Sequence, residues 1–165
     1  YFIGPRQDLE AAQRATRAAV NTVAELSGLR LMLEASATTV EDLSLVPATE
    51  GNEIQLIWLA AGSPHLGDHR LGETELRFSK QRLEVTSAVV LLSDELLQAT
   101  NEGSEKSEIG HDDTATLAVL HELGHAVGLG HSLDPSSVMA PSLAEDAGVT
   151  RGDQSALAYA GTRGC

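Results

Sequence analysis

Residues 121–131 read HELGHAVGLGH, and no other stretch of the 165-residue chain constrains the fold as strongly. Apolar residues at helical spacing lead into it, which predicts a helix over about residues 115–127 that ends at Gly128. His121 and His125 then lie about 6 Å apart on one helix face. Gly128 allows a sharp turn through positive φ, which returns the chain so that His131 can join them. The stretch therefore predicts three imidazoles around one point.

Three imidazole nitrogens are a typical ligand set for Zn²⁺, which they bind at about 2.0–2.1 Å. Three protein ligands leave a fourth position for water, as catalytic rather than structural zinc sites do. Glu122 adjoins the first ligand and can reach that water without binding the metal. HExxH alone often occurs by chance, but the longer pattern makes coincidence improbable. We expect one catalytic zinc ion on His121, His125 and His131, with Glu122 as general base.

The motif resembles the HExxHxxGxxH signature of the metzincin zinc peptidases. Met139 follows eight residues after His131, in HSLDPSSVMAPS, and this segment is similar to the His-Ser-x-Asp…Leu-Met-x-Pro segment of the matrixins, the matrix metalloproteinases. The resemblance implies that Met139 forms the Met-turn beneath the metal. Its specific part covers residues 117–141, whereas the order of elements fits the matrixin catalytic domain over most of the chain.

The resemblance also implies where a substrate would bind. An edge strand over residues 72–78 would pair with an extended peptide, and a specificity pocket would lie near the position of Leu117. Leu143 stands where the family usually has a Tyr wall. Core packing is an equally good interpretation of both leucines. The expected substrate-binding residues are Gly72, Glu73, Thr74, Leu117, Pro141 and Leu143.

Several family features are incomplete in this sequence. His65, Asp68 and His69 cluster in a predicted loop, but the following strands contain no further His, so we expect loop histidines rather than a second, structural zinc. Asp94-Glu95 resembles part of a calcium site whose other ligands are not recognisable, which leaves Ca²⁺ possible but unsupported. Asp153 matches one acid of the matrixin Asp-Asp pair, and Gly152 replaces the other.

The remaining patterns predict an α+β fold, with an α/β-type mixed sheet and three main helices. Helices are expected over residues 7–26 and, after a capping box at Thr150, to residue 160. Strands are expected over 29–35, 53–60, 72–79 and 83–92, the third at an edge or half-exposed and the last in the interior. Residues 37–52 and 101–110 are expected to be loops. We expect one domain: a sheet-containing part (1–115), the active-site helix (116–128) and a C-terminal part (129–165).

Composition limits the partners. With 11 basic and 24 acidic residues the formal net charge is −13, which argues against nucleic acid, and no apolar run is long enough for a membrane span. The single Cys, Cys165, excludes an internal disulfide. We expect a monomer. The start at Tyr1 without Met suggests a processed protein, and the resemblance implies a secreted, extracellular enzyme with a pro-segment or a protein inhibitor as further partners.

The predicted activity is that of a zinc-dependent endopeptidase, which hydrolyses proteins or extended peptides with a metal-activated water and a Glu general base. Two alternatives stay open. One is a catalytically silent metzincin-fold module that only binds peptides, although the presence of Glu122 argues against it. The other is a metzincin peptidase outside the matrixins, because the residues before Leu117 carry few diagnostic features.

Overall fold

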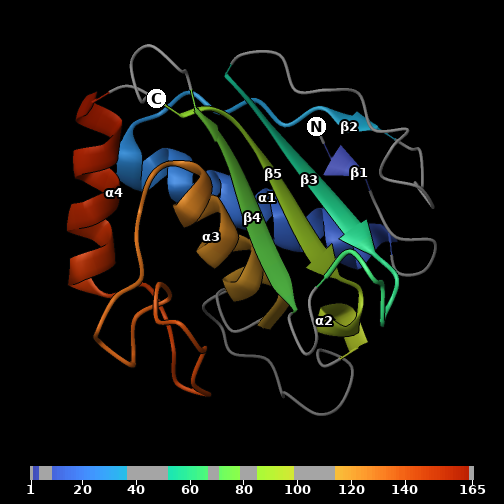
Figure 1. Cartoon of the computed structure of the whole chain (residues 1–165). Coiled ribbons are helices and arrows are strands. Elements are labelled where there is room, and N and C mark those ends of the chain that lie inside the picture. Colours follow the sequence, from blue (N-terminus) through green and yellow to red (C-terminus); the bar gives the residue numbers. More distant parts are fainter. Residues whose placement is uncertain are drawn as a thin grey trace.

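The computed structural model describes residues 2–3, 9–36, 52–66, 71–78, 85–98 and 114–163. Within these ranges the elements follow in the order β1 (Phe2–Ile3), α1 (Leu9–Ser27), β2 (Ala35–Ser36), β3 (Glu53–Leu59), β4 (Gly72–Phe78), β5 (Val85–Ser93), α2 (Glu95–Gln98), α3 (Thr114–Ala126) and α4 (Arg151–Arg163). The strands form one mixed sheet and the helices pack against it, which confirms the α+β class (Figure 1).

The sheet has the strand order β2-β1-β3-β5-β4. Neighbouring strands are parallel except β4, which runs antiparallel to β5 and occupies one edge. The edge position of β4 and the interior position of β5 are as expected. The short β1 and β2 extend the sheet on the other side of β3.

The two faces of the sheet are covered differently. Leu56 and Trp58 of β3, with Val90 and Leu92 of β5, belong to the main core shared with α1 and α3. In Figure 1 both helices lie behind the sheet, with α3 near β4. The residues that alternate with these along β3 and β5 point to the other face, where Ile57, Leu59 and Leu91 pack around Leu66. The sheet and its helical layer thus hold α3 beside the edge strand.

Helix α1 is rich in alanine on the side that it buries. Ala12, Ala15, Ala19 and Val23 recur at helical spacing and are almost fully buried. Their small side chains let α1 pack closely against α3. The helix was expected over residues 7–26, of which residues 7 and 8 lie outside the described ranges.

The strand expected over residues 29–35 is the main error of the sequence prediction. Residues 28–34 have no regular structure, and β2 consists of Ala35–Ser36 alone. Leu29, Leu31 and Leu33 do pack against the main core, while the residues between them are exposed. Core-facing and exposed residues alternate in this segment as they would in a strand. The segment is nevertheless attached to the core by side-chain packing and not by pairing with another strand. The short α2 was not expected.

The other expected elements agree with the structure within a few residues. The predicted loops at 37–52 and 101–110 lie almost wholly outside the described residues. None of the described helices combines the length and apolarity that a membrane span requires.

Thr16 provides a test of the core, because it is fully buried and its Oγ1 accepts a hydrogen bond from Trp58 Nε1 at 3.3 Å. Thr16→Val keeps the shape but leaves the indole N–H unpaired, so the free energy of unfolding should fall by about 1–3 kcal/mol. Trp58 is the sole Trp, so its fluorescence can follow denaturant unfolding. Thr22→Val is the control, because Thr22 only bonds Ala18 O within its own helix and should change stability by less than about 0.5 kcal/mol. Equal stabilities of the two variants would contradict this assignment.

Candidate metal centre

The first two candidate ligands lie on α3, and the end of this helix sets the third. Gly128 has φ 97°, a conformation that strongly favours glycine. Gly128 N donates to His125 O at 2.9 Å, and Leu129 N donates to Gly124 O at 2.9 Å, which is the Schellman pattern of a helix C-terminus. The expected turn at Gly128 is therefore present, and the chain leaves the helix toward His131.

Backbone carbonyls orient the two helical imidazoles. His121 Nδ1 lies 2.7 Å from Val138 O, and His125 Nδ1 lies 2.8 Å from Leu129 O. A carbonyl only accepts, so each Nδ1 must carry the proton and donate. In the neutral imidazole Nε2 then keeps its lone pair, and such a second-sphere bond is the usual partner of a metal-binding His.

The two Nε2 atoms face each other at 3.1 Å. Two lone pairs at that distance repel unless a cation or a proton lies between them. Tetrahedral Zn²⁺ with nitrogen ligands at 2.0–2.1 Å separates those nitrogens by about 3.3 Å. The donor set and its spacing therefore fit a zinc ion.

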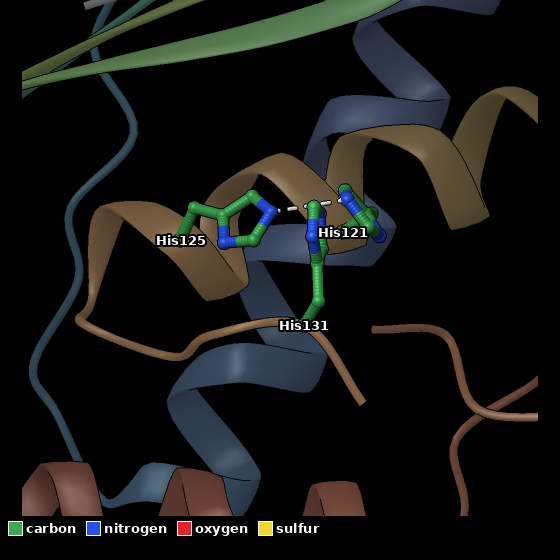
Figure 2. Close-up of side chains that lie close together, drawn as sticks. All are labelled: His121, His125 and His131. Atoms are coloured by element: carbon green, nitrogen blue, oxygen red, sulfur yellow. Dashed lines mark hydrogen bonds between the residues drawn. The ribbon is translucent and has the colours of Figure 1, made fainter. Parts of the chain in front are cut away.

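His131 completes the group from the loop after α3. One ligand atom of each of the three residues lies within 4.8 Å of the others. The His131 ring centroid is 4.8 Å from that of His125 and 5.4 Å from that of His121. Figure 2 shows His121 and His125 on α3 and His131 reaching up to them from the loop. His131 is exposed, so this side of the centre is open to solvent.

Glu122 lies beside this group and is 7% exposed. Its Oε2 accepts a hydrogen bond from Thr74 Oγ1 of β4 at 2.5 Å. Burial raises the pKa of the Glu122 carboxyl above its ordinary value, and the bond from Thr74 opposes that rise. A carboxylate with a raised pKa is better matched to accept and return a proton near neutral pH.

Met139 packs against the part of α3 that lies between His121 and His125. It is 2% exposed, and a Cβ on Gly124 would come within 3.0 Å of its Cε, so the sulfur side chain occupies the space that Gly124 leaves. Met139 O also accepts a hydrogen bond from Ser132 N at 2.7 Å, which ties the Met139 turn to the loop that carries His131.

A buried carboxylate from α4 supports the Met139 turn. Asp153 is 3% exposed and accepts hydrogen bonds from Ser137 Oγ at 2.5 Å and from Thr150 N and Oγ1 at 2.8 Å each. Asp153 N donates back to Thr150 Oγ1, so the predicted capping box at the start of α4 is present. Ser137 Oγ in turn accepts from Met139 N at 2.9 Å. One network thus joins α4 to the residues that flank Val138 O, the acceptor of His121.

The expected substrate-binding residues fall into two groups, one beside Glu122 and one elsewhere. Gly72 and Thr74 face Glu122, and Glu73 next to them is half-buried. The leucines at 117 and 143 are partly buried and pack against the main core, and Pro141 is exposed. The structure thus gives the leucines a packing role.

The residues considered for further metals are only partly described. His65 is exposed, whereas Asp68 and His69 lie outside the described residues, as does Cys165. Asp94 Oδ1 accepts a hydrogen bond from Ala61 N at 2.7 Å and so fixes the turn after β3.

Two features of the site were not anticipated from the sequence. One is the hydrogen bond from Thr74 to Glu122, which joins residues 48 positions apart. Strand alternation places Thr74 on the same face as Gly72, but it does not show that this face meets Glu122. A cavity of about 710 Å³ also lies between the His131 loop and α4, where Tyr159 and Ala160 line it together with Val85 of β5. No pattern singled out in the sequence indicated that cavity, at which Tyr159 is exposed.

The Ser137 network yields a prediction for metal affinity. Ser137→Ala removes the hydroxyl that links Asp153 to Met139 N, so zinc affinity should fall about 10–100-fold, the usual loss for an outer-shell partner. Competition with a chromogenic chelator measures this. Ser136→Ala is the neighbouring control, because the Ser136 hydroxyl bonds only the exposed Asp134 and should leave the affinity unchanged. Equal affinities of both variants would show that the network does not support the ligands.

Comparison with known proteins agrees with this geometry. The family model described as Matrixin matches residues 63–158, more than half of the chain. Over 31 residues the chain is 61% identical to "Probable matrix metalloproteinase 095L" of Invertebrate iridescent virus 3, a stretch that makes up 18% of this chain and only 8% of the viral protein. A metzincin outside the matrixins is thus not favoured. The chain belongs to the matrixin family.

Proposed function

We propose that this protein is a zinc-dependent endopeptidase that cleaves proteins or extended peptides. The observation that carries the proposal is the convergence of three imidazoles, two of them oriented by backbone carbonyls, next to a buried carboxylate. Matrixin membership supports a peptidase with zinc at this group. Here Nε2 of His121 and of His125, with His131, would hold the ion.

The chemistry of the chain follows from these positions. A zinc ion bound there would make the water more acidic and polarise the scissile carbonyl. Glu122 takes a proton from the water as the water oxygen bonds to the carbonyl carbon. Glu122 then gives that proton to the amide nitrogen as the C–N bond breaks. No covalent intermediate with the protein is needed.

The edge strand β4 supports binding of an extended peptide. It is the outermost described strand on its side of the sheet, and α3 packs next to it. A substrate that adds to this edge would place its backbone along Gly72, Glu73 and Thr74 and cross the metal centre. Backbone pairing of this kind suits an endopeptidase, because it selects extended chains rather than particular side chains.

The side-chain preference is proposed to depend on Leu117, Pro141 and Leu143. Both leucines pack on the core while remaining partly exposed, so each can also border a subsite. Leu143 in place of a larger aromatic wall would leave that subsite more open.

Several wider properties belong to the same proposal. We propose one catalytic domain, a monomer and a secreted, extracellular enzyme, whose partners include a pro-segment or a protein inhibitor. The match to the viral protein is too short to carry its activity over to this chain.

Glu122→Ala tests the catalytic role directly. With zinc supplied, the wild type should cut a mixed peptide library, and the variant should lose about 10²–10⁴-fold in kcat/KM while it keeps one zinc per chain. Mass spectrometry of the products measures cleavage, and atomic emission measures zinc. Glu25→Ala, an exposed change on α1, serves as the control. Absence of cleavage by zinc-loaded wild type would favour the silent peptide-binding module, and full activity of Glu122→Ala would exclude Glu122 as the base.

Zinc retention should depend on pH. Burial lowers the pKa of His121 below 6.5, and the partial loss of solvent around the largely exposed ring of His131 lowers the pKa of that residue. Repulsion from the positive form of His125 adds to both shifts. The neutral, metal-binding forms therefore persist to lower pH than in a free histidine. Zinc should stay bound at about pH 6.5 and leave by about pH 4, where protons displace it. Equilibrium dialysis across this range measures the loss; full occupancy at pH 4 would contradict imidazole ligation.

A further inference from the structure

One face of β4 is turned toward α3. Gly72, Thr74 and Leu76 share this face by strand alternation, and Leu76 packs against the main core. The residues between them are directed to the other face, where Glu75 is exposed. On this inward face Gly72 and Thr74 meet Glu122, and Leu76 packs into the core.

Thr74 contacts Glu122 at two atoms. Its Oγ1 lies 2.5 Å from Glu122 Oε2 and 3.0 Å from Glu122 O. The hydroxyl has one proton, and both Glu122 atoms only accept, so the shorter contact with the carboxylate receives it. A hydrogen bond to an ionised carboxylate is strong and directional, which fixes the rotation of the carboxylate.

Gly72 provides the space for the same carboxylate. A Cβ at position 72 would lie 2.7 Å from Glu122 Oε1, 3.0 Å from Cγ and 3.2 Å from Cδ. Contacts this short require the Glu122 side chain to move. The end of β4 therefore meets the side chain at both oxygens: Oε1 occupies the space that a side chain at position 72 would need, and Oε2 accepts the Thr74 hydroxyl.

We propose that Gly72 and Thr74 form a clamp that positions the Glu122 carboxylate for proton transfer, with Thr74 as a positioning residue. The inference rests on the proposed peptidase function. Since Thr74 engages Oε2, the geometry assigns Oε1 as the atom that takes the proton from water and returns it to the leaving nitrogen. The edge strand thus has two roles: its free edge faces substrate, and its inward face holds the base.

Kinetics can separate these two roles. Loss of the clamp should lower kcat with little change in KM, because a misplaced base weakens the chemical step alone. Damage to the substrate-binding edge should instead raise KM. Small displacements of catalytic groups cost up to about 10²-fold. We therefore expect Thr74→Val to lower kcat about 10–100-fold, and Thr74→Ser, which keeps the hydroxyl, to remain within about threefold of wild type.

The matched control is Thr22→Val, which removes a partly buried threonine hydroxyl that bonds Ala18 O within α1 and should leave kcat unchanged. Gly72→Ala tests the clamp independently, because the added methyl group crowds the Glu122 carboxylate and removes no hydrogen bond. It should lower kcat while zinc content and thermal stability stay near wild type. A Thr74→Val enzyme with wild-type kcat, or one whose sole change is a raised KM, would overturn the proposal.

A structural readout does not depend on activity. Crystal structures of the metal-free wild type and metal-free Thr74→Val should differ in the Glu122 side chain, with the carboxylate turned away from position 74 in the variant. An unmoved carboxylate would overturn the clamp. If the wild type proves inactive, the peptidase proposal fails while this comparison still decides whether Thr74 positions Glu122.

Discussion

Two hydrogen bonds from imidazole to backbone determine what this site can do. Val138 O and Leu129 O accept from Nδ1 of His121 and of His125, and so direct both Nε2 atoms to one point 3.1 Å apart. Both acceptors are backbone carbonyl oxygens, so no single side-chain substitution can remove either of them directly. Their positions depend on the backbone of two turns, and the rest of the site holds those turns in place.

Each turn is fixed by a different part of the chain. The Schellman turn at Gly128 places Leu129 O, and the network from Asp153 through Ser137 holds the turn that carries Val138 O. Helix α4 therefore supports the site through this network, although it supplies none of the three imidazoles. On the other side, β4 brings Thr74 against Glu122. The sheet edge, α3 and α4 act together to orient three imidazoles and one carboxylate.

Sequence reasoning succeeded where the decisive interactions are local. The spacing of His121 and His125 on a helix, the turn at Gly128 and the capping box of α4 each involve only a few neighbouring residues, so periodicity and residue type predicted them. It failed for residues 29–35, where alternation resembles a strand but pairing depends on distant segments. The contact of Thr74 with Glu122 could not be predicted from the sequence for the same reason. Which residue faces Glu122 depends on the register of β4 against β5, and that register is a tertiary property.

Zinc coordination by the three imidazoles can be tested directly on the zinc-loaded protein, by X-ray absorption at the zinc edge and by anomalous diffraction from crystals. We expect one zinc per chain bound through Nε2 of His121 and of His125, with His131 as third nitrogen ligand and one oxygen donor, at about 2.0–2.1 Å. Zinc on an Nδ1 atom, at a different group of residues, or with four protein ligands and no oxygen from water would contradict it.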